Sequence, residues 1–252
     1  MEAFERENTI LEFLKENKSS SIENLAKICN SSTMTIRRDL KRLKESKVME
    51  QRKGIVYLKK DIYLLPPYVY RKSLYKKTKQ AMALKALEFI NDGDVIILDA
   101  GTSCMEISYL LNERKNLTVI TNDLDIASIA SNYDITVYIA GGKIENKNNC
   151  SSSIETIEYI KRFRASKAFI GTSGITNDLY FCANSSDKVE IKKTMMDISN
   201  TNILVADSSK FDSASVISVR PLNSFDYIIT DKIFSNDETI IIEENGGKIL
   251  NV

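Results

Sequence analysis

A run of cationic side chains lies between residues 33 and 44, in the sequence TMTIRRDLKRLK. As a helix, this segment places Ile36, Leu40 and Leu43 in one apolar stripe and directs its arginines and lysines away from that stripe. Arginine and lysine bind phosphate oxygens, and a short helix of this kind fits the major groove of DNA. Taken alone, the pattern is more typical of a solvated, charged helix face. The neighbouring segments are therefore needed to distinguish such a face from a DNA-binding helix.

A second set of candidate residues lies in short polar turns that follow buried strands in the C-terminal two thirds of the chain. Glycines and hydroxyl side chains in such turns expose backbone N–H groups and O–H donors to an anion. The turns are residues 99–103 (DAGTS), 121–123 (TND), 141–143 (GGK), 171–174 (GTSG) and 207–211 (DSSKF). Each turn alone is more simply a helix cap, but five turns at one edge of a sheet indicate a site for a small polar ligand.

The segments around the cationic run predict a helix-turn-helix unit. Arg6 to Asn17 reads as one helix, and Ser21 can cap a second helix over 22–28. A polar turn at 30–32 follows, in which Ser31 or Ser32 can cap the cationic helix. Val48 to Leu58, with Gly54 between two short apolar runs, is consistent with a β-hairpin wing.

Beyond residue 76 the pattern changes to helices that alternate with short, continuously apolar strands. We expect helices at 76–91, 103–111, 124–131, 154–163 and 188–199, and strands at 95–98, 117–121, 135–140, 168–171, 203–206, 227–230 and 239–242. This alternation predicts an α/β domain with a mostly parallel sheet covered on both faces. Pro66-Pro67 interrupts regular helix, so the predicted division is 1–58 for DNA binding, 59–75 as linker and 76–252 for effector sensing and oligomerisation.

Charge is divided between these parts. Residues 1–80 contain 19 Lys and Arg against 10 Asp and Glu, a net charge of +9, whereas residues 81–252 contain 16 against 24, a net charge of −8. A basic head on an acidic body is expected where only the head binds nucleic acid.

The composition also argues against several other classes of protein. The chain has no histidine, and its four cysteines show no C-x-x-C spacing, which argues against a zinc site and against a Ser-His or Cys-His nucleophile pair. We expect no cofactor. No apolar run is long enough to cross a membrane, and the N-terminus lacks the regions of a signal peptide, so we expect a cytoplasmic protein without membrane contact.

Two sets of motifs carry a family resemblance. TIRRDLKRL followed by a short hairpin resembles the winged helix-turn-helix of the DeoR family of bacterial transcription regulators, although the wing has Arg52-Lys53-Gly54 where the family commonly has His-Gly-Gly. LDAGT, VITN, AGG, FIG, ADSSKF and ITD, in this order, resemble the motifs of that family's C-terminal sensor domain. The resemblance implies a fold akin to ribose-5-phosphate isomerase and CoA-transferase-like domains, with a phosphorylated sugar or sugar derivative as effector.

Both sets of site residues follow from these readings. The residues expected to contact DNA are Ser32, Thr33, Thr35, Arg37, Arg38, Lys41, Arg42, Lys44, Arg52 and Lys53. Those expected to bind the effector are Asp99, Gly101, Thr102, Ser103, Thr121, Asn122, Gly141, Gly142, Gly171, Glu190 and Lys210. The resemblance implies that the 99–103 loop and Lys210 hold the charged end of the effector, and that Glu190 is an acidic position near the site.

The leading hypothesis is a transcription regulator that represses a sugar-metabolism operon by binding a double-stranded operator. Dimers or tetramers of the chain would place two cationic helices on an inverted repeat. One alternative is a sugar-phosphate isomerase-like enzyme, with Asp99 or Glu190 as base and Lys210 as electrophile. Another is a DNA-binding regulator that has lost its ligand response, because the stretches 148–153 and 179–181 lack glycines that the family usually shows there.

Overall fold

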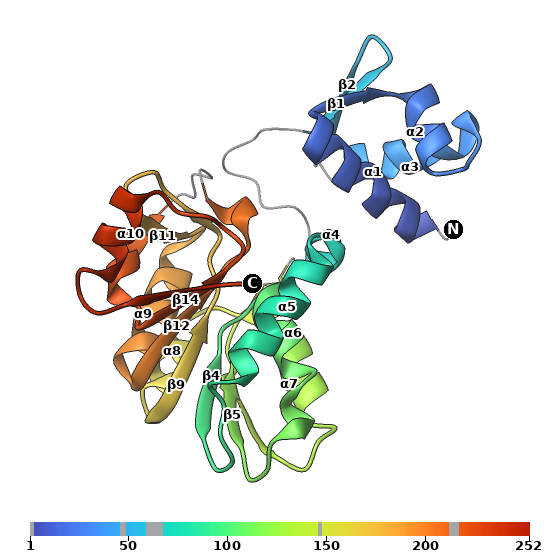
Figure 1. The fold of residues 1–252 in the computed structure, drawn as a ribbon. Coiled ribbons are helices and arrows are strands. Elements are labelled where there is room, and N and C mark those ends of the chain that lie inside the picture. The colour runs from blue at the N-terminus through green and yellow to red at the C-terminus, as the bar shows by residue number, and fades with distance from the viewer. Residues whose placement is uncertain (1–2, 46–48, 59–67, 146–147, 212–216) are drawn as a thin grey trace. The chain divides into compact units, whose positions relative to one another are not determined.

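The computed structural model describes residues 3–45, 49–58, 68–145, 148–211 and 217–252 (Figure 1). The chain forms two compact units, Met1–Leu74 and Tyr75–Val252. Part of the expected linker, Tyr68–Ser73, is helical and is labelled α4, whereas Pro66-Pro67 lies outside the described residues. The functional boundaries at 58 and 76 remain predictions.

The first unit contains the expected three helices and wing. Its elements are α1 (Ala3–Asn17), β1 (Ser19–Ser21), α2 (Ile22–Ile28), α3 (Thr33–Glu45), β2 (Met49–Arg52), β3 (Ile55–Leu58) and the helix α4 described above. The Ser21 hydroxyl accepts a hydrogen bond from the Asn24 N–H at 3.1 Å, and the Ser32 hydroxyl accepts one from the Thr35 N–H at 3.1 Å, so each caps a helix. Strand β1 pairs with β3 and adds a third strand that its serine sequence did not indicate.

Two sequence features fix the shape of this unit. Its core consists of apolar side chains from all three helices and the sheet, with Ile10, Leu14 and Leu25 among the fully buried ones. At the tip of the wing, Lys53 and Gly54 both have positive φ, 49° and 82°, which is the conformation of a two-residue type I′ turn.

The second unit is built on a seven-stranded sheet with the order β15-β14-β12-β9-β4-β5-β6, in which every neighbouring pair is parallel. The strands are β4 (Val95–Leu98), β5 (Thr118–Thr121), β6 (Thr136–Ile139), β9 (Ala165–Ile170), β12 (Ser199–Val205), β14 (Tyr227–Thr230) and β15 (Lys248–Asn251). The expected parallel sheet is therefore confirmed, and the carboxyl ends of its strands lie along one edge.

Helices cover both faces of this sheet, as Figure 1 shows. The helices are α5 (Lys76–Leu87), α6 (Thr102–Ser108), α7 (Leu124–Ala130), α8 (Ile154–Ile160), α9 (Ser186–Asp197) and α10 (Asn236–Glu243). Successive strand residues point to opposite faces. Ile96 therefore packs in one core with α5, α6 and α7, whereas Ile97 packs in the other with α8, α9 and α10.

One expected strand was wrong: residues 239–242 belong to α10. The reason is a capping box, in which the Ser235 hydroxyl accepts from the Glu238 N–H at 3.2 Å and the Glu238 carboxylate accepts from the Ser235 N–H at 2.7 Å. The other expected elements are present, some with the expected bounds and the rest with ends shifted by a few residues.

Two small antiparallel elements were not expected. Strands β10 (Gly174–Ile175), β11 (Tyr180–Ala183) and β13 (Ile217–Pro221) form a second sheet, and β7 (Ile144–Glu145) pairs with β8 (Cys150–Ser151) as a short hairpin. Among the helices described, none is long and apolar enough to cross a membrane.

Candidate functional site

The outer face of α3 carries most of the residues expected to contact DNA. Ser32, Thr33, Arg37, Arg38, Lys41 and Lys44 are exposed. Ile36, Leu40 and Leu43 are buried against the rest of the unit, so the apolar stripe holds the helix in place while the cations face water. Thr35 is half-buried, and its hydroxyl lies 2.9 Å from that of Ser32.

Arg42 has a different environment from the other cations of α3. Its Nε donates to Oε1 of Glu7 at 2.6 Å, and its Nη2 forms an ion pair with Asp39. Asp39 is fully buried and also accepts from Nε of Arg6 at 2.8 Å. Sequence reasoning did not find this network, which joins α1 to α3. DNA contact by Arg42 remains a prediction.

The expected wing cations lie at the tip of the β2–β3 hairpin. Arg52 and Lys53 are both exposed. The Arg52 guanidinium is 3.1 Å from the Glu50 carboxylate, an exposed pair of the kind that contributes little to stability. Both wing cations are therefore accessible to a phosphate backbone.

In the second unit, the strand ends bring Asp99 and Gly171 together. Asp99 follows β4, and its Oδ2 accepts from the Gly171 N–H, which follows β9, at 2.9 Å. The same oxygen forms an ion pair with Lys192 of α9, whose Nζ also donates to the Gly171 carbonyl at 2.8 Å. The Asp99 and Lys192 side chains are only 3% and 7% exposed. Sequence reasoning missed Lys192, although a lysine spaced i, i+3, i+4 with Met195 and Met196 on an apolar face indicates a buried cation that needs a partner.

A second cluster joins the ends of β4 and β5. The Gly101 N–H donates to Oδ2 of Asp123 at 3.2 Å, and Oδ1 of Asp123 caps α7 by accepting from the N–H groups of Asp125 and Ile126. Burial raises the pKa of Asp123 to about 6. The Thr121 hydroxyl accepts from the Asp123 N–H at 3.1 Å. Thr102 and Ser103 begin α6 beside this cluster and are buried.

The β7–β8 hairpin is anchored to the same edge of the sheet. Asn122 follows β5. Its side-chain Nδ2 donates to the Ser151 backbone carbonyl at 2.8 Å, and its backbone carbonyl accepts from the Ser151 N–H at 2.9 Å. The Asn122 Oδ1 is buried and has no partner among the described residues. At the other end of the hairpin, Glu145 is 2.5 Å from Nζ of Lys188 on α9.

Two glycines follow β6, as the motif required. Gly141 and Gly142 are exposed, and the Gly141 carbonyl accepts from the Thr156 hydroxyl at 2.9 Å. At Gly142 φ is 145°, and a Cβ atom there would lie 2.5 Å from the Thr156 hydroxyl oxygen. Only glycine fits this position without movement of its neighbours.

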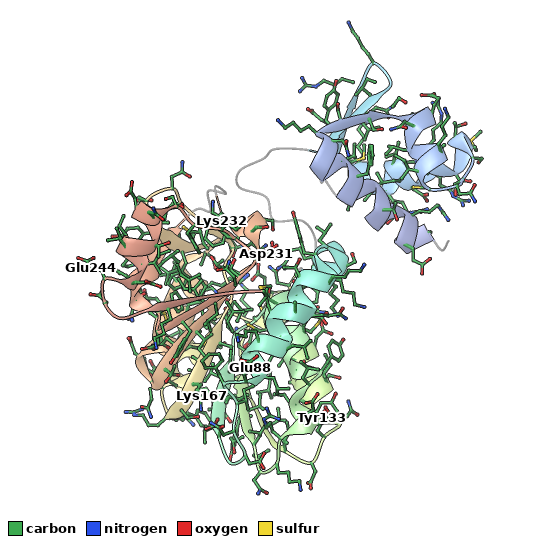
Figure 2. All side chains as sticks on the ribbon, viewed as in Figure 1. Glu88, Tyr133, Lys167, Asp231, Lys232 and Glu244 are labelled. Carbon is green, nitrogen blue, oxygen red and sulfur yellow. The ribbon has the colours of Figure 1, made fainter. Side chains whose placement is uncertain are left out.

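Lys210 lies at the end of β12, in the 3₁₀ turn η2 (Ser208–Lys210), and is half-buried. Asp207 caps this turn by accepting from the Ser209 N–H at 3.0 Å, while its other carboxylate oxygen is buried without a partner among the described residues. Asp231, after β14, accepts from the Ser208 N–H at 2.5 Å. Figure 2 shows Asp231 and Lys232 at one end of this unit and Lys167, near the start of β9, toward the other.

Glu190, on α9, does not share the buried position of the expected effector residues Asp99 and Gly171. It is exposed, and its carboxylate is 3.1 Å from Nζ of Lys193 on the same helix. Positions 190 and 192 of a helix face different directions, and here Lys192 is the one that faces Asp99. A role for Glu190 in the site remains a prediction.

Metal and thiol chemistry gain no support from the described residues. No three His, Cys, Asp or Glu side chains among them are grouped so as to hold a metal ion. All four cysteines are buried, and burial raises the pKa of Cys150 to about 11, which disfavours the reactive thiolate.

Comparison with known proteins agrees with the two-unit architecture. A family model described as the DeoR-like helix-turn-helix domain matches residues 6–60, and one described as the DeoR C terminal sensor domain matches residues 75–232. An uncharacterized HTH-type transcriptional regulator of Haemophilus influenzae is 33% identical over 96% of this chain and 94% of its own length.

Two relatives have more specific names. The HTH-type transcriptional repressor GlcR of Bacillus subtilis is 30% identical over 98% of this chain and 95% of its own. The glycerol-3-phosphate regulon repressor of Escherichia coli is 28% identical over 92% of each. Among solved structures, ribose 5-phosphate isomerase A of Neisseria gonorrhoeae aligns over 56% of this chain and 54% of its own, with 15% identity and a TM-score of 0.40.

Proposed function

The chain belongs to the DeoR family of transcription regulators, and we propose that it represses a sugar-metabolism operon under the control of a phosphorylated sugar or sugar derivative. In this proposal the first unit binds operator DNA and the second unit binds the effector. The chain itself would not be an enzyme.

The observation that carries the DNA-binding part is the outward cationic face of α3. Arg37, Arg38 and Lys41 are exposed on a helix whose opposite side is fixed in a core. Side chains on such a face can reach base edges and phosphates of a major groove without disturbing the fold. Lys53 at the tip of the wing can add a backbone contact, and the net charge of +9 over residues 1–80 attracts DNA at longer range.

The effector part is supported by the parallel strand ends. In open α/β sheets, ligands bind outside the carboxyl ends of the strands, and here that edge carries the glycine and hydroxyl turns that follow β4, β5, β6, β9 and β12. Lys210 supplies a cation at this edge. The name of the Escherichia coli relative refers to a phosphorylated metabolite, which favours an anionic effector for this chain as well.

The effector can change operator affinity only by binding one arrangement of the protein more tightly than another. We propose that the arrangement in question is that of a homo-oligomer, in which two copies of α3 meet the two halves of an inverted repeat.

The test uses the full chain and a duplex enriched from a random-sequence pool by that chain, hereafter the selected duplex. Binding to this duplex is measured while sugar phosphates and their unphosphorylated parents are titrated in. We expect only phosphorylated compounds to weaken binding. Lys210→Ala should cost about 1.5–3 kcal/mol of effector affinity, the value of a charge-assisted hydrogen bond, and should leave DNA affinity near wild type. Equal binding of both forms of the compounds, or their turnover at enzymatic rates, would contradict the proposal.

A further inference from the structure

Four charged side chains join α1 to α3 in the DNA-binding unit; three of them are buried, and the fourth, that of Arg42, is 39% exposed. Arg6 and Glu7 come from α1, and Asp39 and Arg42 come from α3; we call them the α1–α3 network. Asp39 is fully buried, and its carboxylate forms ion pairs with both arginines, with Nε of Arg6 at 2.8 Å and with Nη2 of Arg42. Two of the four charges are positive and two are negative, so the network is neutral.

Apolar packing of Ile36, Leu40 and Leu43 sets which side of α3 faces the core, but it defines the rotation of the helix about its own axis only coarsely. Hydrophobic contacts, such as those of Ile36 and Leu43, are non-directional. A guanidinium, by contrast, holds its donors in a rigid planar fork, and ionic hydrogen bonds to it are directional. Arg42 uses two donors of that fork, Nε toward α1 and Nη2 toward its own helix. The network is therefore a directional contact between α1 and α3.

We propose that Arg42 is a positioning residue of the DNA interface, which acts through Glu7 and Asp39 to set the rotation of α3. The direct contacts to bases and phosphates are then made by exposed cations on the outer face of the same helix, Arg37, Arg38 and Lys41. This inference rests on the proposed DNA binding, and it replaces direct phosphate contact as the role of Arg42.

Glu7→Gln distinguishes a positioning role of the network from a purely electrostatic one, because the two predict opposite changes in DNA affinity. This substitution removes a negative charge from the DNA-binding unit, so electrostatics alone predicts equal or tighter binding to any duplex. Positioning predicts instead that affinity for the selected duplex falls about 5- to 150-fold, which corresponds to one misplaced base contact. Affinity for an unrelated duplex of equal length should not fall, so the ratio of the two affinities should drop.

Arg42→Lys and Arg42→Ala complete the test, with Arg38→Ala as the matched control from the outer face. A phosphate contact needs only a positive charge, whereas the bridge to Glu7 and Asp39 needs the fork. We expect both Arg42 variants to lose affinity for the selected duplex with an unchanged salt slope. Arg38→Ala should lower that slope by about one if Arg38 contacts a phosphate. Circular dichroism and protection of α1 amides from hydrogen exchange identify the variants that are folded, and only those are compared.

Three results would overturn the inference: a slope lowered by about one in Arg42→Ala, wild-type affinity in Arg42→Lys, or undiminished affinity in folded Glu7→Gln. If the wild-type chain enriches no sequence from the pool at all, the proposed DNA binding fails instead, and the two failures remain distinct.

Discussion

Replacement of Lys192 by methionine tests whether the buried ion pair with Asp99 organises the strand ends of the second unit. Methionine keeps an unbranched side chain of similar length but removes the ammonium group. Asp99 would then retain the Gly171 N–H as a partner but lose the ammonium of Lys192, in a position where its side chain is 3% exposed. Removal of one member of a buried pair costs about 3–5 kcal/mol, because the other charge is left buried without compensation.

The neighbouring residue provides the matched control. Lys193 also pairs with a carboxylate, that of Glu190, but the two side chains are 36% and 58% exposed. Such a surface pair contributes about 0–1 kcal/mol, so Lys193→Met should change little. The same chemical substitution on the same helix should therefore differ in its cost by several kcal/mol between positions 192 and 193.

Hydrogen exchange followed by mass spectrometry measures this difference in the full chain. A loss of 3–5 kcal/mol corresponds to about 10²- to 10⁴-fold faster exchange of the β4 and β9 amides, where exchange reports the opening equilibrium. Amides of α2, in the first unit, serve as an internal reference. Adding Asp99→Asn to Lys192→Met should recover part of the loss, since no charge is then buried. Equal exchange in the 192 and 193 variants would refute the reasoning.

Three further predictions concern other parts of the molecule. Arg38→Ala and Lys41→Ala should each weaken binding to the selected duplex. A lost base contact should cost about 1–3 kcal/mol, and a lost phosphate contact should lower the salt slope by about one. Full-strength binding by the folded double variant in a fluorescence-anisotropy titration would contradict the assignment. Because burial raises the pKa of Asp123 to about 6, above its ordinary 3.8, the folded chain holds this proton more tightly than the unfolded chain. Its stabilising contribution of roughly 3 kcal/mol is thus fully present below pH 4 and lost as the pH rises to about 6, and Asp123→Asn should abolish that part of the pH dependence of thermal unfolding. Among three Gly→Ala variants, alanine should lower stability least at Gly171, where its Cβ would lie at an ordinary 3.5 Å from Asp99. It should cost about 1–3 kcal/mol of stability at Gly101, where φ is 147°, and should cost most at Gly142, where a positive φ and a steric clash coincide. A different order of melting temperatures would show that these loops relax.

Several features of the fold could be predicted from the sequence because a local signal and the tertiary structure agreed. Helix α2 has the expected bounds, since Ser21 caps its start and its apolar spacing matches a helical period. Strand β4, four consecutive aliphatic residues, also has the expected bounds. The cationic helix was recognised because three apolar residues fixed which side had to be inward, and the cations were left on the other side.

The errors have equally local causes. Ile240-Ile241-Ile242 has the composition of a strand, but only Ile242 of the three is buried, and the capping box formed by Ser235 and Glu238 just before the run selects a helix. In the sheet β10-β11-β13, strands β11 and β13 lie about 40 positions apart in the chain, so no local pattern reveals their pairing. Within the candidate site, the burial of Lys192 could not be predicted, because it depends on which face of α9 meets β4 and β9.

The strand order of the large sheet has a consequence for how the chain emerges from the ribosome. Strand β4 pairs on one side with β5, which follows it closely in the chain, and on the other side with β9. Ile97 can therefore pair with Ala168 only after the ribosome has added about 70 more residues. At a synthesis rate of about 5–20 residues per second, roughly 4–14 s pass before that partner is made. During this interval Val95–Leu98 is an aliphatic strand with one unpaired edge, able to pair with a neighbouring nascent chain. The β4-β5-β6 part of the sheet is therefore synthesised first, and β9, β12, β14 and β15 can then add one after another from the free edge of β4.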